Sequence, residues 1–441
     1  MKKFYFLAIA LTGVLASAQL SWQPQATNFS PSWGIDEINI VNENVVWATA
    51  YDGTGAGTYP KDFAVTSNGG TSWVAKTAEE MPAAALFSDI YAFSSTTAFI
   101  ITAPSSGGAS SNGIWKTTDG GDNWTKYSGA IFNNSASFAN HIYFWDENNG
   151  YAGGDPVANK FEMYKTTDGG NTWTVISTAP APQNGDEFTY VGVKEVHGDN
   201  IWLGTSTGRI LRSTDRGNTW TAHISPAMDF GGVITEGSSA SFAFSSATNG
   251  LLITNDNGFA VLYETTNGGE SWTDITPNGP WYYGDIAYVP GTPNTYVSTG
   301  INSAAPMGSS YSTDGGLNWI EIDAGEQRGK VEFLNGTTGW CGQFSDGPGG
   351  STGIMKFQGS LAVSDVVAKS NLQVYPNPAT SVVNFSAKNQ ITGVVLADMT
   401  GKVVAKSTSS SINVSSLAAG VYVAQVKYAN GSVENTKVIV K

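Results

Sequence analysis

Acidic residues beside the predicted strands are the first candidates for chemistry in this sequence of 441 residues. Asp52, Asp155 and Asp285 each lie where a run of apolar residues meets glycine-rich or polar sequence. Two carboxyl groups facing each other across a cleft can hydrolyse a glycosidic bond, at about 5–5.5 Å for retaining and about 6.5–9.5 Å for inverting enzymes. These three residues are therefore candidate catalytic acids, although a chain with 36 acidic residues also brings some acids together by chance.

Aromatic residues in similar segments are candidates for binding. Trp281, Tyr282 and Tyr283 are consecutive, and Tyr59 lies in another glycine-rich segment. Such rings stack on sugar rings or on apolar side chains. Three consecutive rings in one turn cannot all be buried in the same core, so we expect this set to reach a ligand. The alternative is that these rings cap the ends of sheets and bind nothing.

Metal and cofactor chemistry has few candidate residues. The chain has one cysteine, Cys341, and three scattered histidines. This set excludes an internal disulfide and is poor for zinc, so we expect no cofactor and no metal site. The formal net charge of −14 disfavours nucleic acid and anionic lipid as partners, because both require a basic surface.

The elements that carry these residues are predicted from composition and from an internal repeat. With 52 glycines, 12% aromatic and 13% charged residues, the chain is typical of many short strands joined by tight turns, an all-β protein. Six eight-residue segments align without gaps, and their final tryptophans are spaced by 51, 49, 47, 52 and 47 residues. The third and eighth positions of these segments are Asn68 and Trp73, Asp119 and Trp124, Asp168 and Trp173, Asp215 and Trp220, Asn267 and Trp272, and Asp314 and Trp319.

These six segments, which we call boxes, resemble the Asp box (S/T-x-D-x-G-x-x-W) of BNR-repeat, sialidase-like and sortilin-like propellers. The Asp or Asn oxygen can accept backbone N–H groups of the turn, glycine permits a positive φ, and the tryptophan begins the next strand. In two boxes an asparagine replaces the aspartate, which keeps the oxygen that accepts hydrogen bonds but removes the negative charge. We therefore expect a structural role for these positions and not a catalytic one.

Hairpins of alternating apolar residues between the boxes complete the repeat. Seven hairpins accompany six boxes, and the missing strands are at the two ends. Gly353–Phe357 resembles a strand that enters a box, and Leu20–Gln23 resembles a strand that leaves one. Pairing of these segments would close a ring and remove its open edges. We therefore predict a seven-bladed β-propeller over residues 19–360, with its ligand-binding loops on the face opposite the boxes.

The C-terminal segment predicts a second domain, a small antiparallel β-sandwich of immunoglobulin-like type over residues 372–441, after a linker at 361–371. It resembles the type A C-terminal sorting domain of the Bacteroidetes type IX secretion system. The residues that carry the resemblance are Tyr375, Pro376, Asn377, Pro378, Gly401, Lys402, Gly420 and Tyr422. The resemblance implies that the secretion machinery is a partner and that it recognises this domain as a signal for export.

The N-terminal segment predicts entry into the same export route. Lys2 and Lys3 precede an apolar run, which ends before Ala16-Ser17-Ala18. We expect residues 1–18 to be a signal peptide and expect no transmembrane segment, because the apolar run is shorter than the roughly 20 residues that span a bilayer. The mature protein is therefore expected to be secreted or to lie at the outer cell surface.

These observations favour a non-enzymatic binding module for a glycan, a peptide or a protein. The alternatives are a glycoside hydrolase of the Asp-box propeller type and a structural surface protein. Sialidases hold the substrate carboxylate with arginines from several blades, whereas three of the four arginines here, Arg209, Arg212 and Arg216, lie within eight residues. The sequence therefore disfavours a sialidase.

Overall fold

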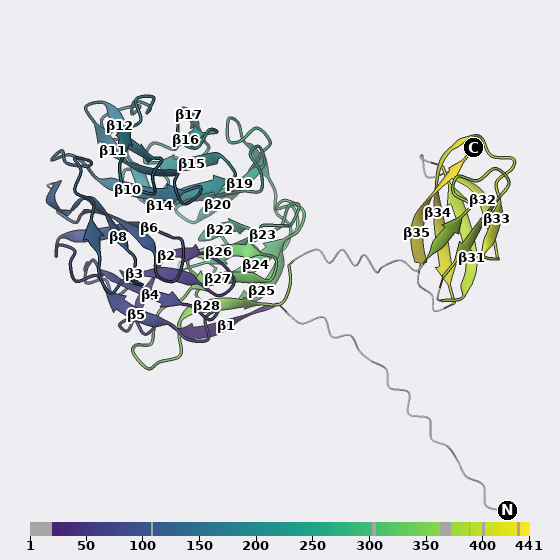
Figure 1. The fold of residues 1–441 in the computed structure, drawn as a ribbon, viewed down its shortest axis with the longest axis horizontal. Coiled ribbons are helices and arrows are strands. Elements are labelled where there is room, and N and C mark those ends of the chain that lie inside the picture. The colour runs from purple at the N-terminus through teal and green to yellow at the C-terminus, as the bar shows by residue number, and fades with distance from the viewer. Residues whose placement is uncertain are drawn as a thin grey trace, which may run out of the picture. The chain divides into compact units, whose positions relative to one another are not determined.

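The chain forms two compact units, divided between Val363 and Ser364 (Figure 1). The computed structural model describes residues 20–106, 109–301, 306–361, 372–387, 389–398, 402–429 and 433–441. The predicted signal peptide lies outside the described residues, as do residues 362–371 of the predicted linker. The described elements are β-strands, apart from one short 3-10 turn, η1 (Ala109–Ser111). Among these residues, no helix has the length and apolarity that a membrane crossing needs.

Seven four-stranded antiparallel sheets make up the described part of the first unit. Six of them each contain four successive strands. Three of these are β2 (Trp33–Ile40), β3 (Val46–Asp52), β4 (Asp62–Thr66), β5 (Val74–Thr77); β6 (Ala85–Ala92), β7 (Ala98–Pro104), β8 (Gly113–Thr117), β9 (Thr125–Lys126); and β10 (Ala139–Phe144), β11 (Gly150–Val157), β12 (Lys160–Thr166), β13 (Thr174–Val175). The other three are β14 (Thr189–His197), β15 (Asn200–Thr205), β16 (Arg209–Ser213), β17 (Thr221–Ile224); β18 (Ser238–Phe244), β19 (Gly250–Asp256), β20 (Phe259–Thr265), β21 (Thr273–Ile275); and β22 (Asp285–Tyr288), β23 (Tyr296–Gly300), β24 (Gly308–Ser312), β25 (Ile320–Ala324).

The seventh sheet joins the two ends of this unit, in the order β1 (Ser21–Ala26), β28 (Gly353–Gln358), β27 (Thr338–Gly342) and β26 (Val331–Asn335). β1 runs antiparallel to β28 with Trp22 opposite Phe357, and Figure 1 shows the two strands side by side. The Trp22 ring is buried against Phe357, with centroids 5.4 Å apart, and its Nε1 donates to Ser309 Oγ at 2.8 Å. The predicted pairing of the two ends is thereby confirmed.

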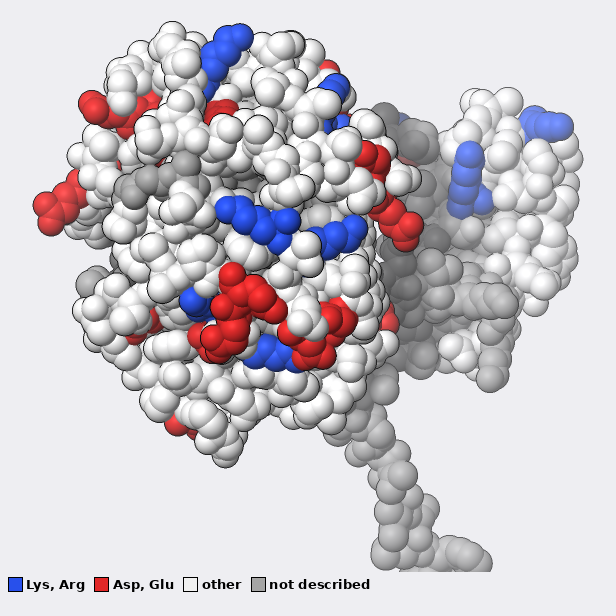
Figure 2. All heavy atoms as spheres, turned by 60° about the vertical axis from the view of Figure 1, so that its left-hand side comes forward, with Lys and Arg blue, Asp and Glu red and all other residues white. Residues whose placement is uncertain are grey.

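The sheets surround a common axis. The inner strand of each sheet, which is β26 in the seventh, contacts the inner strand of the next, in the order β2, β6, β10, β14, β18, β22, β26 and back to β2. This closed ring of inner strands is the arrangement of a β-propeller, and it confirms the predicted all-β fold. Charged side chains are sparse on the face that Figure 2 shows, where acidic and basic groups lie in small clusters within an uncharged surface.

The six boxes share one hydrogen-bond pattern. In the third box, Thr166 Oγ1 donates to Asp168 Oδ1 (2.8 Å) and accepts the N–H of Gly170 (2.9 Å), and Asp168 Oδ1 accepts the N–H of Thr172 (2.8 Å). The other five boxes have the same three bonds. Hydrogen bonds from the Thr172 hydroxyl and N–H lower the pKa of Asp168 to about 2, so its carboxylate remains an ionised acceptor within the turn.

The described residues of the second unit form two sheets around their own core, with the orders β29-β30-β33 and β32-β31-β34-β35. The strands are β29 (Gln373–Tyr375), β30 (Val382–Ser386), β31 (Ile391–Ala397), β32 (Val403–Ser407), β33 (Ser411–Asn413), β34 (Gly420–Tyr428) and β35 (Val433–Val440). Asn377 holds the last strand, because its Nδ2 donates to Lys437 O (3.0 Å) and its Oδ1 accepts the N–H of Ile439 (2.8 Å). The Tyr422 hydroxyl donates to Ala418 O (2.7 Å), and Gly401 lies outside the described residues.

Candidate functional site on the propeller axis

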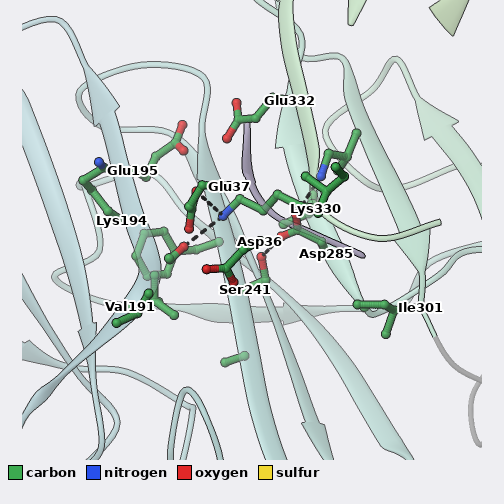
Figure 3. A pocket seen from close by; sticks show the side chains of 18 of the residues that line it. Asp36, Glu37, Val191, Lys194, Glu195, Ser241, Asp285, Ile301, Lys330 and Glu332 are labelled. Carbon is green, nitrogen blue, oxygen red and sulfur yellow. Dashed lines mark hydrogen bonds and ion pairs between the residues drawn. The ribbon is translucent and has the colours of Figure 1, made fainter. Parts of the chain in front are cut away.

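The inner strands bring polar and charged side chains together at the axis. Each of the seven inner strands, or the residue next to it, contributes at least one such side chain. These are Asp36, Glu37, Asp89, His141, Lys194, Glu195, Ser241, Asp285, Lys330 and Glu332. Figure 3 shows Asp36, Glu37, Asp285 and Lys330 pointing toward one another. We call these ten residues the axial cluster.

Two lysines of the axial cluster bridge strands across the ring. Lys330 Nζ donates to the backbone oxygen of Gly192 on β14 (2.9 Å) and lies 3.6 Å from Glu37 Oε2 on β2. Since β14 lies three sheets away from β26 around the ring, this contact spans the channel. Lys194 on β14 pairs with Asp89 on β6 and donates to Ile142 O on β10 (2.9 Å). The lysines therefore partly plug the channel.

A cavity opens on each side of this plug. The loop-side cavity, of about 430 Å³, is lined by the beginnings of the inner strands, with Asp36, Ser241, Asp285 and Tyr51 among its walls. The box-side cavity, of about 330 Å³, is lined by the ends of the same strands, including His197. Both cavities reach Glu37, Lys194, Glu195, Lys330 and Glu332. The loop-side cavity lies on the face where ligand-binding loops were predicted.

Burial shifts the ionisation of the axial acids. Because burial penalises the charged form, it raises the pKa of Glu37 to about 8, of Glu332 to about 7 and of Asp36 to about 6. Burial, and then the charge of Glu332, also raise the pKa of Glu195 well above its ordinary value. These acids hold protons more tightly than free carboxyl groups because the effect of burial outweighs the opposing effect of the charge of Lys330.

The bases of the axial cluster respond to the same surroundings. Burial alone would lower the pKa of Lys330, but the nearby carboxylates, Glu37 first, together raise it above its ordinary value. Burial, and then the charges of Lys194 and Lys330, hold the pKa of His141 well below its ordinary value, so this residue is neutral. Neither ring nitrogen of His141 has a hydrogen-bond partner among the described residues.

The axial cluster holds more carboxyl groups than ammonium groups, although the raised pKa values of Glu37, Glu195 and Glu332 keep part of these carboxyl groups protonated at neutral pH. Six carboxyl groups face two ammonium groups, those of Lys194 and Lys330. Within the described part of the chain, the carboxyl groups of Asp36 and Glu332 accept no hydrogen bond, although both line a cavity. A group of positive charge would therefore be stabilised in the loop-side cavity. No set of three or more His, Cys, Asp or Glu residues in the described chain is placed to hold a metal ion.

The structure does not bring the three candidate acids to one place. Asp285 lines the loop-side cavity, but its Oδ1 accepts the hydroxyl of Ser241 (2.6 Å) and its Oδ2 the N–H of Val331 (3.0 Å). Asp52 is partly exposed outside this cavity. Hydrogen bonds from the hydroxyl groups of Thr54 and then Thr58 hold its pKa below the ordinary range.

Asp155 lies elsewhere, in the wall of a cavity of about 490 Å³ near Phe188 and Ile234, which we call the side cavity. Its Oδ1 accepts Asn140 Nδ2 (2.6 Å). Burial raises its pKa to about 7, although this hydrogen bond acts in the opposite direction. Because Asp52, Asp155 and Asp285 lie in three separate surroundings, no two of them line the same described cavity.

The candidate aromatic residues do not line the axial cavities either. Tyr282 is buried, and its hydroxyl donates to Asp323 O (3.1 Å). Trp281 and Tyr283 are partly buried and pack against each other at 5.9 Å between centroids, beside the core around β22. Tyr59 is 52% exposed on a loop. Tyr282 therefore has a structural contact in place of the ligand contact we expected of this set.

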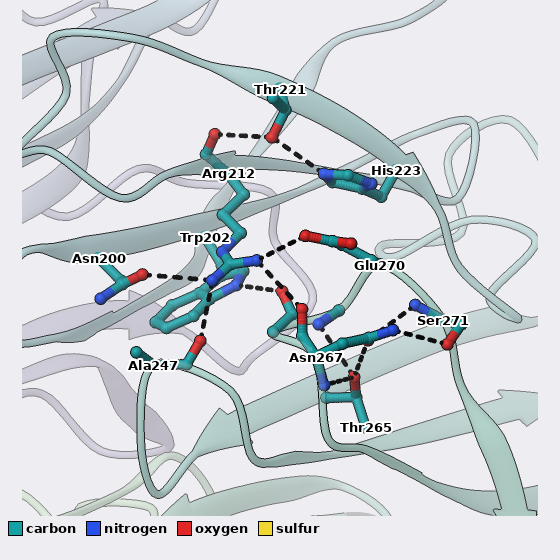
Figure 4. A network of polar contacts seen from close by, with 12 residues as sticks. Asn200, Trp202, Arg212, Thr221, His223, Ala247, Thr265, Asn267, Glu270 and Ser271 are labelled. Atoms are coloured by element: carbon teal, nitrogen blue, oxygen red, sulfur yellow. Dashed lines mark hydrogen bonds and ion pairs between the residues drawn. The ribbon is translucent and has the colours of Figure 1, made fainter.

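The arginines are engaged in structural contacts. Arg209 pairs with Glu187, and Arg328 pairs with Asp323. Figure 4 shows Arg212, whose guanidinium group donates to the backbone oxygens of Ala247 (2.9 Å) and Asn267 (3.1 Å) in the next sheet. Its charge also lies over the ring of Trp202, 5.6 Å from the centroid. Three lysines make the corresponding contact with a box glycine, and these are Lys76 with Gly120 O, Lys116 with Gly169 O and Lys356 with Gly69 O.

Reasoning from the sequence predicted binding loops on the loop-side face but did not predict the axial cluster. Its signal is an ionisable residue inside an otherwise apolar inner strand, as in Ser88-Asp89-Ile90 or Gly284-Asp285-Ile286. A single ionisable residue in one strand would be interpreted as a solvent-exposed residue. The same feature in successive repeats would have indicated side chains that share an axis.

Two family models match parts of the chain. Residues 373–441 match the model described as a secretion system C-terminal sorting domain, and residues 107–242 match the model of the photosynthesis system II assembly factor YCF48. No curated protein matches the sequence. These matches confirm the two resemblances, to a repeat propeller and to a sorting domain. The sorting domain indicates export by type IX secretion to the cell surface or outside the cell.

Solved structures with a similar fold include YCF48 bound to D1 peptide, at a TM-score of 0.51 and 15% identity, over 78% of this chain and 98% of that one. YCF48 from Cyanidioschyzon merolae has a TM-score of 0.51 and 16% identity, over 77% and 99% of the two chains. An ancestral GH74 enzyme has a TM-score of 0.50 and 13% identity, over 95% of this chain and 63% of its own. At such identities the similarity concerns the fold alone.

Proposed function

We propose that the exported protein is a binding module, and that its ligand places a cationic group in the loop-side cavity. The observation that carries this proposal is the excess of carboxyl groups in the axial cluster, six against two ammonium groups, around a cavity lined by Asp36, whose pKa of about 6 leaves it ionised at neutral pH. Low-dielectric walls strengthen the attraction between such an acid and an entering cation. Asp36 is the first contact we assign, because it lines the cavity and its carboxyl group accepts no hydrogen bond within the described chain.

A peptide with a lysine or arginine side chain fits this site better than a neutral glycan. An entering cation favours the ionised form of the axial acids and is attracted by it, whereas the hydroxyl groups of a neutral glycan supply no positive charge. YCF48, a propeller of similar fold, has been solved with a bound D1 peptide, which supports the idea that such a fold accepts a peptide. We do not propose a glycoside hydrolase, because Asp52, Asp155 and Asp285 are apart.

The test is binding of the mature full chain to an array of random decapeptides and, in parallel, to a glycan array. We expect the bound peptides to be enriched in lysine or arginine. Asp36→Asn removes one negative charge without changing the size of the side chain. We expect this variant to bind the selected peptides about tenfold more weakly. Glu80→Gln is the matched control, because Glu80 is exposed on a loop of the same face outside the cavity.

Three results would contradict the proposal. The first is an array on which no peptide binds or on which basic residues are not enriched. The second is selection of neutral glycans in place of peptides. The third is equal affinity of the Asp36→Asn variant and the wild-type protein for the selected peptides.

A further inference from the structure

An anchored loop beside the loop-side cavity exposes large apolar side chains. The loop, residues 226–237, joins β17 to β18, and β18 supplies Ser241 to the cavity wall. Met228, Val233 and Ile234 on this loop are 50%, 68% and 51% exposed. Exposed apolar side chains that lie close together on a soluble protein indicate a surface that another molecule covers.

The backbone of this loop is held by buried groups. Asp229 is fully buried, and its carboxylate accepts the N–H of Ile234 (2.8 Å) and the hydroxyl of Tyr190 (2.6 Å). Phe230 is buried against Phe242, with ring centroids 5.5 Å apart. Asp229 and Phe230 thus hold the conformation of the loop. The exposed apolar side chains do not contribute to these contacts and are available to a ligand. A preorganised loop of this kind loses little conformational entropy when a ligand binds.

The loop also forms part of the side cavity. Ile234 lines this cavity together with Phe188 and Pro156, and the acids Asp155 and Asp186 lie at the same cavity. Phe188 precedes β14, and Val191 on β14 lines the loop-side cavity, three residues further along the chain. Three residues of extended chain span roughly 10 Å, and β14 bulges between Thr189 and Lys194, so this length is an upper limit for the distance between these two wall residues. The two cavities are therefore neighbours on the same side of the propeller.

We propose that the side cavity and the loop 226–237 bind an apolar side chain of the same ligand whose cationic group enters the loop-side cavity. This inference rests on the proposed function and specifies the ligand as an extended peptide. Alternate side chains of an extended chain point to the same side and lie roughly 7 Å apart, within this limit, so we place the apolar residue two positions from the basic one. Asp186 adds negative charge beside the apolar walls, which also favours a basic peptide.

The test uses thirteen-residue Gly/Ser peptides with a central lysine and one leucine, with the leucine one, two or six positions from the lysine on either side. Calorimetry with the mature full chain measures each affinity. We expect leucine at two positions to strengthen binding about tenfold over the peptide without leucine, because an apolar side chain is buried. The variant Val233→Ser/Ile234→Ser should lose this gain, whereas Ile224→Ser, which changes a 76% exposed side chain on β17, should keep it.

The outcomes separate this inference from the proposed function. If Asp36→Asn weakens binding but Val233→Ser/Ile234→Ser does not, the inference is wrong and the proposed function stands. If no lysine peptide binds, both are wrong. A gain that is equal at all three spacings also overturns the inference. As a second measurement, photo-leucine at the favoured position should cross-link to residues 228–234, and cross-links confined to other regions would contradict the placement.

Discussion

Replacement of Asp155 by asparagine should stabilise the protein at alkaline pH. The pKa of Asp155 rises from 3.8 to about 7 on folding, chiefly because burial penalises the carboxylate. The folded state therefore binds this proton more tightly than the unfolded state. Between pH 3.8 and about 7, each rise in pH lowers the free energy of unfolding, because only the folded protein retains the proton.

The magnitude follows from the shift. A rise of about three pKa units, at about 1.4 kcal/mol for each unit, corresponds to about 4 kcal/mol when Asp155 is fully ionised. Relaxation and water access reduce this value, so we expect Asp155→Asn to gain about 2–4 kcal/mol between pH 4 and pH 8 relative to the wild type. Asparagine keeps an oxygen that accepts Asn140 Nδ2, which bonds Asp155 at 2.6 Å. The acids of the axial cluster contribute equally to both proteins and cancel in the difference.

The assay is urea unfolding at pH 4, 6 and 8, followed by tryptophan fluorescence. All 14 tryptophans precede residue 341, so the signal reports on the propeller and not on the sorting domain. Asp52→Asn is the matched control on the same face. Because hydrogen bonds from Thr54 and Thr58 hold the pKa of Asp52 below its ordinary value, neutralising it should not stabilise the protein at pH 8. A free-energy change for Asp155→Asn that is the same at pH 4 and pH 8 would refute the reasoning.

Two further predictions concern buried cations. Arg212→Met removes charge-assisted hydrogen bonds to two backbone oxygens and the contact with Trp202, so it should cost about 3 kcal/mol in urea unfolding. Arg216→Met changes a side chain that is 44% exposed and should cost much less, and equal costs would contradict the role of Arg212. Lys330→Met leaves Glu37 without its nearest ammonium and should cost about 3 kcal/mol at pH 8. The cost should be smaller at pH 5, where Glu37, whose pKa is raised to about 8, is protonated, and a cost independent of pH would count against this account of the plug.

Much of the architecture is determined by local sequence. A box places an oxygen acceptor, a glycine and a tryptophan within eight residues, and those residues by themselves make the turn that Asp168 illustrates. The resemblance of Leu20–Gln23 and Gly353–Phe357 to strands on either side of a box predicted their pairing, because an open ring would expose two strand edges. The sorting domain was predicted from a resemblance carried by residues such as Asn377, whose side chain contacts Lys437 and Ile439, 60 and 62 residues further along the chain.

The axial site was decided by the tertiary structure. Glu37, Asp89, Lys194 and Lys330 are separated by tens to hundreds of residues, and they meet only because the sheets close around one axis. The same holds for two residues outside the axial cluster. Nothing in the neighbouring sequence indicates that the ring of Tyr282 is buried or that the carboxyl group of Asp155 lies in the side cavity. A repeat determines how each sheet folds, because its turns and strands depend on neighbouring residues. The electrostatics of the channel depend on distances between sheets, and these exist only once the ring has closed.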